Sequence, residues 1–214
     1  MKKNKEHLAR ETSRIEAFSD GVFAIAMTLL VLDLKVPHSL NGNIPLLQAL
    51  ASEWPIFAAY LTSFATIGIM WMSHHYLFTV IHRSDHWLFL INLFLLLLIT
   101  FVPFPTSMVA EYIGKSAENA ASALYSGTFF IIALAFQFLW RHASKNRRLI
   151  GESVDESIVR GITSSYRFGP PLYLAAFILS FINVIAAMAV TFGLAIFFAI
   201  PPKKPAKSPL LPSR

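Results

Sequence analysis

The sequence predicts an all-α, polytopic membrane protein with six transmembrane helices per subunit. Of its 214 residues 55% are apolar and only 14% are charged, whereas soluble domains are nearer a quarter charged. The apolar residues gather into runs that can cross a hydrocarbon core roughly 30 Å thick. Basic residues flank these runs, so we attribute the net charge of +6 to contact with a membrane surface and expect no binding of nucleic acid.

The apolar runs set the expected spans, which are 17–36, 54–79, 87–108, 119–140, 164–181 and 183–200. The last two lie in one apolar stretch that is too long for one span and short for two. A tight hairpin near Ser180–Asn183 fits this length, since Asn is a turn residue. Pro170 and Pro171 suit the first turn of the fifth helix, and Pro201 ends the sixth.

The distribution of basic residues predicts the topology. All but Lys35 and Lys115 of the 18 Lys and Arg residues fall on the side that also holds both termini. Cytoplasmic loops carry such an excess of positive charge, so both termini are expected in the cytoplasm. Trp54, Trp87 and Trp140 fall at predicted membrane interfaces, as an aromatic belt requires.

The two ends of the chain lie outside the predicted spans. The basic segment 1–14 resembles the start of a signal peptide, but Asp20 and Asp33 bracket the next apolar run and no small-residue cleavage site follows. We therefore expect a retained first helix. Residues 1–201 are predicted to form one six-helix domain, and the Pro- and Lys-rich segment 202–214 a disordered cytoplasmic tail.

The first helix carries charge close to its apolar centre. Asp20 and Asp33 are closer together than the roughly 20 apolar residues of a lipid-exposed span. Ionisable residues within a span usually face the bundle interior or water, so this helix either lines an aqueous path or is surrounded by others. Alternatively, both aspartates sit at the helix ends, in the interface. The residues alone leave the two readings open.

A stripe on the first helix is a candidate pore lining. Ile25, Leu29 and Leu32 share one face, with Thr28 beside it. In a pore these aliphatic side chains would form stacked apolar rings that strip water from an ion. Nearly every span carries such a stripe, however, so ordinary packing or lipid contact is the more frequent explanation.

Polar side chains from three helices are predicted to meet near the inner membrane face: Arg14, Ser19 and Asp20 on the first, Trp71, His74 and His75 on the second, and Asn92 on the third. Buried polar groups in a bilayer need partners, which predicts a hydrogen-bond network. A structural role is favoured over catalysis, since adjacent histidines point about 100° apart and there is no metal-binding or nucleophile–base motif and no cysteine. A proton relay through the histidines stays open.

Two motifs resemble the transmembrane protein 175 family of lysosomal potassium channels and their bacterial relatives. The family signature R-x-x-x-F-S-D is matched by Arg14, Phe18, Ser19 and Asp20, and the run 71–75 looks like its W-x-x-H-H pattern. The six-span plan extends the resemblance over nearly the whole chain.

The resemblance implies a potassium-selective channel without the carbonyl filter of ordinary potassium channels, of which the sequence shows no TVGYG-like loop. A single repeat implies the bacterial form, a homotetramer in the plasma membrane. Ile25 would form the narrowest ring, followed by Thr28 or Leu29 and then Leu32. The motif residues would hold the first helix in place. We add that Asp33 could concentrate cations at the outer mouth.

Other classes remain as alternatives. A secondary transporter could couple protons through His74 or His75, but no span is visibly broken at mid-membrane and no internal repeat is evident. Proton conduction by the channel is a further possibility. A membrane enzyme or scaffold has no catalytic constellation to support it. We expect no enzyme activity, no cofactor and no bound metal, with potassium as the permeant ion and the bilayer and further copies of the chain as partners.

Overall fold

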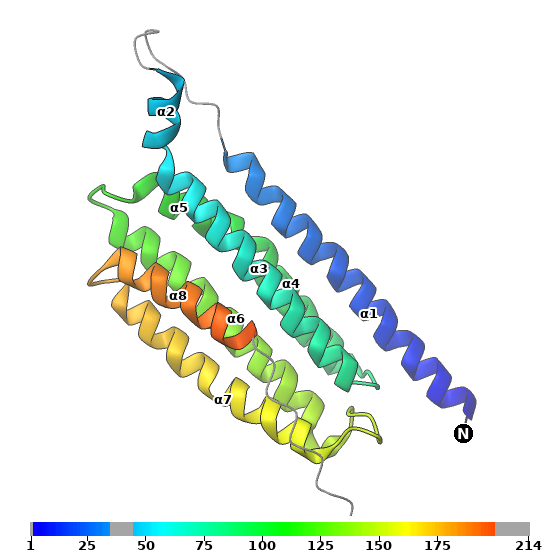
Figure 1. Ribbon diagram of the computed structural model, residues 1–214. Helices are drawn as coiled ribbons and strands as arrows, with labels where there is room; N and C mark the ends of the chain where they lie inside the picture. The colour runs from blue at the N-terminus through cyan, green and yellow to red at the C-terminus, as the bar shows by residue number, and fades with distance from the viewer. Residues whose placement is uncertain (1, 35–44, 200–214) are drawn as a thin grey trace, which may run out of the picture.

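The computed structural model describes residues 2–34 and 45–199, and their side chains apart from those of 2–11, 33 and 199. Within these ranges the chain forms eight α-helices and two short 3-10 helices (Figure 1). They are α1 (Lys2–Leu29), η1 (Leu30–Asp33), α2 (Leu46–Ser52), α3 (Trp54–Val80), α4 (His86–Phe101), α5 (Pro103–Tyr112), α6 (Glu118–Ser144), η2 (Lys145–Arg147), α7 (Glu156–Leu179) and α8 (Val184–Ala199).

The long helices run side by side as an elongated bundle. In Figure 1, α1 lies on one flank, α3 and α4 lie in the middle, and α6, α7 and α8 form the other flank. α1 packs on α3 and α4, while α6 contacts α4, α5, α7 and α8. α6 therefore holds the bundle together, and it buries Phe129, Ile132, Leu139 and Trp140.

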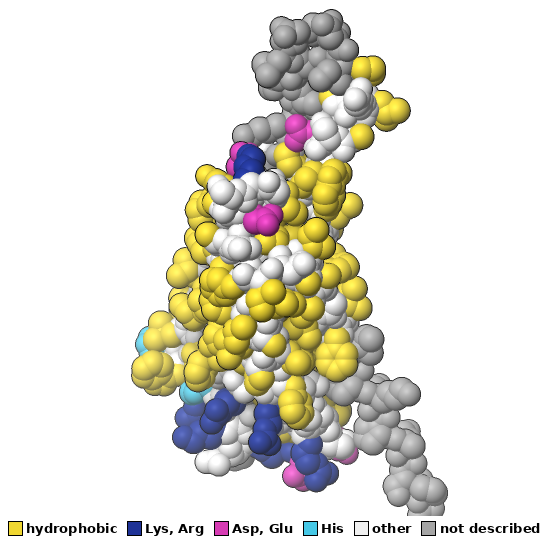
Figure 2. All heavy atoms as spheres, turned by 90° about the vertical axis from the view of Figure 1, so that its left-hand side faces the viewer, with side chains coloured by type: hydrophobic (Ala, Val, Ile, Leu, Met, Phe, Trp, Pro, Cys, Tyr) yellow, Lys and Arg dark blue, Asp and Glu magenta, His cyan; other side chains and the backbone are white. Residues whose placement is uncertain are grey.

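Four segments are long and apolar enough to cross a membrane: Thr12–Leu32, Trp54–Val80, His86–Tyr112 and Glu118–Arg147. Figure 2 shows hydrophobic side chains over the middle of one face and Lys and Arg gathered at one end. We call the end formed by the α3–α4 loop, the last turn of α6 and the α6–α7 loop the basic end; it holds Arg83, Arg141 and Arg148. The prediction of an all-helical membrane protein is confirmed. The predicted fifth and sixth spans are not among these four segments; they correspond to α7 and to the shorter apolar helix Val184–Phe198.

The predicted helix limits agree with the structure at several spans and differ at the first. α3 (Trp54–Val80) matches the span predicted at 54–79, and α8 matches the one at 183–200. The first helix instead begins at Lys2 and ends in a 3-10 turn at Asp33, although 17–36 was predicted. The prediction followed apolar residues only, and the polar residues before Ala17 continue the same helix. The last residues of that predicted span and the tail 202–214 lie outside the described residues.

Proline accounts for two further differences. The third predicted span, 87–108, is two helices, because Pro103 has no N–H and starts α5 directly after α4. This break lies near the end of the span and not at its middle. The placement of Pro170 and Pro171 in a first helical turn is wrong, because both lie inside α7. α7 begins earlier, where the Asp155 side chain accepts a hydrogen bond from the Ser157 N–H at 2.7 Å.

Trp140 also departs from the prediction of an interfacial belt. Its side chain is 1% exposed, and its Nε1–H donates to Thr163 Oγ1 at 2.9 Å. It therefore joins α6 to α7, whereas Trp54 and Trp87 are exposed. The predicted hairpin at Ser180–Asn183 is confirmed, since these residues separate α7 from α8.

The loops at the basic end are tied together. The His82 N–H donates to the Leu149 carbonyl at 2.9 Å, and the Gly151 N–H donates to the Val80 carbonyl at 3.1 Å. A side chain at Gly151 would collide with the His82 ring, so glycine permits this close approach. The α3–α4 loop and the α6–α7 loop are thereby fixed to each other.

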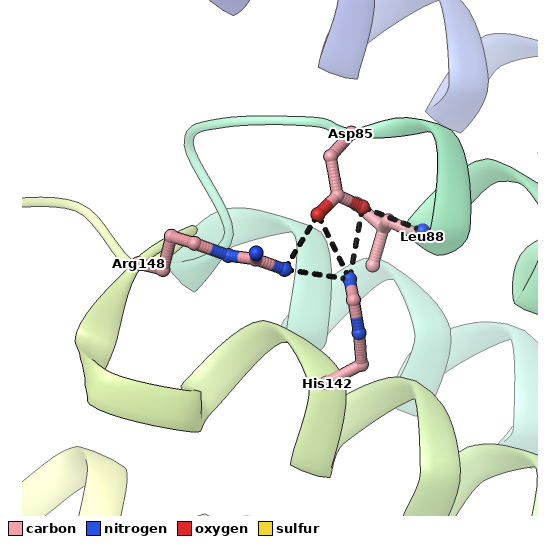
Figure 3. Close-up of polar contacts among 4 residues, drawn as sticks. All are labelled: Asp85, Leu88, His142 and Arg148. Carbon is pink, nitrogen blue, oxygen red and sulfur yellow. Dashed lines mark hydrogen bonds and ion pairs between the residues drawn. The ribbon is translucent and has the colours of Figure 1, made fainter.

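The Asp85 carboxylate accepts several polar contacts at the same end (Figure 3). It caps α4 by accepting the Leu88 N–H at 2.8 Å, and it contacts His142 Nε2 at 2.9 Å and Arg148 Nη2 at 2.6 Å. Burial alone would raise the pKa of Asp85, but the Leu88 hydrogen bond, His142 and Arg148 outweigh it and lower that pKa below its ordinary value. The carboxylate thus anchors the start of α4.

Candidate functional site

One face of α1 is buried against α3 and α4. Its buried residues recur every three or four positions, as one side of a helix requires: Thr12, Ile15, Ser19, Phe23, Ala26 and Leu30. Ser19 is a polar residue in the middle of this face, and like Phe23 it is almost fully buried. A hydroxyl buried in that position needs a partner within the protein, because neither solvent nor lipid offers it a hydrogen bond.

Ser19 belongs to a chain of hydrogen bonds that crosses three helices. Asn92 on α4 donates from Nδ2 to Ser19 Oγ at 3.0 Å, and Ser19 donates to the Ile15 carbonyl at 2.8 Å. Asn92 Oδ1 lies 2.8 Å from His74 Nε2 on α3. An amide oxygen only accepts, so His74 carries its hydrogen on Nε2. Every donor in this series of hydrogen bonds therefore points from α3 through α4 toward α1.

The His74 ring is fixed by aromatic neighbours. It is 0% exposed, its centroid lies 4.6 Å from that of Phe78, and Phe23 of α1 lies at 5.4 Å on a tilted ring. Its other nitrogen, Nδ1, is buried and has no hydrogen-bond partner within the described residues. Asn92 is thus the polar contact that holds this imidazole.

A second row of contacts lies beside the first and is more exposed. Trp71 Nε1–H donates to Asp20 Oδ1 at 2.8 Å, and His75 Nδ1 lies 2.8 Å from Glu16 Oε1. The rings of Trp71 and His75 stack with 27° between their planes. Glu16 was not singled out from the sequence, although its position four residues before Asp20 places both carboxylates on one side of α1.

The opposite face of α1 is exposed in the subunit and carries the rest of the predicted site. Ile25 is 58% exposed and Leu32 is 70% exposed, and Phe18 and Leu29 are exposed as well. Thr28 lies on this face, with its hydroxyl donating to the Ile25 carbonyl at 2.9 Å. Arg14 is also exposed. The structure does not bring these residues into the polar network, and the side chain of Asp33 lies outside the described ones.

The spacing on that exposed face is regular. Its residues are spaced alternately by four and three positions, which is the period of a seam between helices. They are Arg14, Phe18, Gly21, Ile25, Thr28 and Leu32. Large aliphatic side chains along this face are exposed in the single subunit, where lipid or another helix can contact them. One face of α1 is therefore tied to α3 and α4 by polar contacts, and the other is presented outward.

These features define a class: a multi-pass helical membrane protein that holds its first helix by a buried polar network. Within the described residues, no group of three or more His, Cys, Asp and Glu side chains is placed to hold a metal ion. The two histidines of α3 contact an amide and a carboxylate and not each other. The network is therefore suited to positioning a helix.

Comparison with known proteins gives the family. The sequence profile described as "Endosomal/lysosomal potassium channel TMEM175" matches residues 14–103. A potassium channel of Chamaesiphon minutus is 51% identical over 89% of this chain and 94% of its own length, and one of Streptomyces collinus is 41% identical over 88% and 91%. The chicken endosomal/lysosomal proton channel TMEM175 is 35% identical over 67% of this chain and 30% of its own length.

A solved structure agrees with this assignment. The crystal structure of a lysosomal potassium-selective channel TMEM175 homolog from Chamaesiphon minutus superposes with a TM-score of 0.81 at 50% identity, covering 89% of this chain and 97% of that one. The chain belongs to the TMEM175 family, which is a family of ion channels and not of enzymes. The resemblance seen in the two motifs and the expectation that the protein is not an enzyme are confirmed.

Proposed function

We propose that this chain is the subunit of a homotetrameric, potassium-selective channel that conducts passively. The observation that carries the proposal is the division of α1 into two faces. Ser19, Asp20 and Glu16 are engaged with α3 and α4, while Ile25 and Leu32 remain exposed. Four such helices around one axis would turn the exposed seam toward a central path. The bacterial relatives named as potassium channels support potassium as the permeant ion.

The pore would be lined from Ile25 through Thr28 and Leu29 to Leu32. Ile25 would form the narrowest ring, a hydrophobic constriction that an ion passes only by shedding water. Potassium is more weakly hydrated than sodium, so this ring favours potassium, but less strongly than a carbonyl filter does. Four copies of Asp33 at the outer mouth would raise the local cation concentration.

The polar network would set the position of this pore helix. Because each bond of the chain from His74 through Asn92 to Ser19 is directional, the network fixes the rotation of α1 as well as its distance. A rotation of α1 would move Ile25 away from the axis. Asp20, the residue after Ser19, adds a second point of attachment through Trp71, which lies about one turn before His74 on α3.

The membrane arrangement completes the proposal. With α7 and α8 as the fifth and sixth spans, both termini would fall on the side of the basic end, and that side would face the cytoplasm because positively charged loops stay inside. The α7–α8 hairpin and the gathering of Lys and Arg in Figure 2 agree with this topology. The plasma membrane is the proposed location, since the relatives that match over nearly their full length are bacterial.

Proton conduction is the second candidate. The animal relatives are named as proton channels, and the buried Nδ1 of His74 has no partner within the described residues. A protonated imidazole here would be a buried charge next to Phe23 and Phe78, which is costly. This cost makes potassium conduction the better supported function.

Currents across a planar bilayer test the proposal. The purified protein is reconstituted with potassium on one side and sodium on the other, at equal pH. A channel gives a current that reverses at a potential favouring potassium. A flux that runs uphill when a proton gradient is imposed would identify a coupled transporter instead, and the absence of current at every voltage would refute the channel.

A further inference from the structure

His142 has two kinds of neighbour that one nitrogen atom cannot satisfy at once (Figure 3). Its Nε2 lies 2.9 Å from both carboxylate oxygens of Asp85 and 3.0 Å from Arg148 Nη2. An ionised carboxylate only accepts hydrogen bonds, and a guanidinium only donates them. Nε2 therefore bonds Asp85 when it carries a hydrogen, and it bonds Arg148 when it carries a lone pair.

Protonation of the imidazole removes this choice. The neutral ring has a tautomer with a lone pair on Nε2, whereas both nitrogens of the charged ring carry hydrogens. Charged His142 donates to Asp85, and its contact with Arg148 becomes one between two cations. Arg148 Nη2 lies 2.6 Å from Asp85 Oδ2 and 3.0 Å from His142 Nε2, so its attraction to the carboxylate and its repulsion from the imidazolium are of similar size.

Arg148 is the member of the cluster that can leave. Its side chain is 56% exposed, whereas those of His142 and Asp85 are 19% and 27% exposed. His142 stands on the last turn of α6, and Asp85 is held at the start of α4 by the Leu88 N–H. A guanidinium as exposed as that of Arg148 loses little when water replaces its ion pair.

The backbone beside Arg148 is strained. Asn146 and Arg147 have φ values of 53° and 54°, in the left-handed region. Asparagine tolerates this conformation, but a residue such as Arg147 rarely adopts it. The turn is held by contacts on both sides, because Arg147 Nη2 donates to the Val154 carbonyl at 2.6 Å and Arg148 is bound to Asp85. Loss of the second contact would let the turn relax.

This turn continues into the residues that fix the loop to α3. The Leu149 carbonyl accepts the His82 N–H at 2.9 Å and the Arg83 N–H at 3.2 Å, and the Gly151 N–H donates to the Val80 carbonyl at 3.1 Å. α3 ends at Val80, so these bonds anchor its last turn. The same helix carries the side chains that hold α1.

We propose that Asp85, His142 and Arg148 form a pH-sensitive latch at the basic end. While His142 is neutral, Arg148 stays in the cluster and the α6–α7 loop is fixed to α3. When His142 gains a proton, Arg148 leaves, the loop loosens and α3 loses part of its anchorage. Imidazoles change charge between about pH 5 and 8. The effect on conduction rests on the proposed function, in which α3 positions the pore helix.

The surrounding elements carry other charged groups and two more histidines. Arginine, lysine and glutamate keep their charge between about pH 5 and 8. These groups are Arg141 and Lys145 on α6, which are exposed, and Arg83 and Glu152 of the two loops, which pair at 2.6 Å. The histidines are His82, whose Nε2 lies 3.1 Å from the Thr79 carbonyl, and His86, which is exposed on α4. A test must separate His142 from these two imidazoles.

Hydrogen exchange measured by mass spectrometry tests the latch. The full-length protein in lipid vesicles is labelled at about pH 5.5 and at about pH 7.5, on the two sides of the imidazole range, and rates are corrected for the intrinsic pH dependence of exchange. We expect peptides that contain the amides of His82 and Gly151 to exchange about two- to fivefold faster at the lower pH, which is the effect of losing one partly exposed ion pair.

Three variants assign the effect. His142→Gln can still donate to Asp85 but gains no charge, so it should remove the difference between the two pH values. Arg148→Gln should exchange at the faster rate at both, and His86→Gln, the matched control, should behave as the wild type. Equal corrected rates in the wild type would overturn the proposal. A pH difference that persists in His142→Gln would assign the response to another group and overturn it as well.

Potassium flux into vesicles tests the link to the pore helix. Flux should fall between the higher and the lower pH in the wild type and in His86→Gln, and it should fall less in His142→Gln. Equal falls in all three would overturn the coupling of the latch to conduction. Exchange needs no conduction, so a failure of the latch is distinct from a failure of the channel proposal.

Discussion

Replacing Asn92 by leucine probes the polar network at its centre. Asn92 joins His74 at 2.8 Å to Ser19 at 3.0 Å and is 1% exposed. Leucine preserves most of the side-chain volume, so the change removes hydrogen bonds more than packing. His74 then loses its described polar partner, since Nδ1 has none among the described residues. Ser19 still donates to the Ile15 carbonyl.

The expected cost follows from these contacts. A buried donor left without a partner costs about 1–3 kcal/mol, while hydrogen bonds between membrane helices average about 0.6 kcal/mol. We therefore expect Asn92→Leu to lower the free energy of unfolding by about 1–3 kcal/mol. Thr100→Leu on the same helix is the control, because Thr100 is exposed and its hydroxyl bonds its own helix at Leu97. It should change stability by less than about 0.5 kcal/mol.

Unfolding in mixed micelles with increasing dodecyl sulfate, followed by circular dichroism, measures this cost. The protein concentration is held fixed because an oligomer's stability depends on it. Potassium flux into vesicles is recorded for the same variants, and Asn92→Leu should reduce it. If Asn92→Leu and Thr100→Leu unfold alike and both conduct normally, the network does not position α1 and the reasoning fails.

Three further predictions concern single side chains. Asp85→Asn should make the melting temperature fall less as the pH is lowered. The lowered pKa of Asp85 gives stability that is complete above about pH 4 and is lost as the pH falls through the pKa of Asp85 in the folded protein. A melting temperature with the same pH dependence as the wild type would contradict this. Trp71→Phe removes the bond to Asp20 and should reduce potassium flux in vesicles, whereas Trp87→Phe, on an exposed tryptophan, should not; equal fluxes would refute the role of Trp71. Asp33→Asn should lower single-channel conductance at low salt, and the difference should vanish near 1 M salt, where charges are screened within about 3 Å; equal low-salt conductance would remove Asp33 from the mouth.

Hydropathy and charge were sufficient to predict the long helices, because a membrane span must satisfy its own backbone and cover itself with apolar side chains. The limits of α3 and the hairpin at Ser180–Asn183 follow from this rule and from turn residues. The rule does not determine where a helix stops outside the membrane. The early start of α7 is set by the Asp155 cap and was therefore not predicted. The part of α1 before Thr12 was not predicted either, because it has no apolar run.

The contacts of the site were partly predictable. A polar side chain inside a span needs a partner, and this requirement pointed to Ser19, His74 and Asn92 as residues that share a depth. This requirement could not show which side chains contact each other, because the depth of a residue in the membrane does not fix the rotation of its helix. The contact between His75 and Glu16 was missed for this reason. Trp140 was misplaced because an indole at a span end suits either an interface or, as here, a neighbouring helix.

The most direct test of the account is the ion selectivity of Ile25→Asn, recorded in a planar bilayer with potassium on one side and sodium on the other. Ile25 is exposed on the outward face of α1, away from the polar network. The wild-type current should reverse at a potential favouring potassium, and Ile25→Asn should conduct but lose this preference. Currents with unchanged selectivity would show that Ile25 does not form the constriction and that the proposed pore-lining face of α1 is wrong.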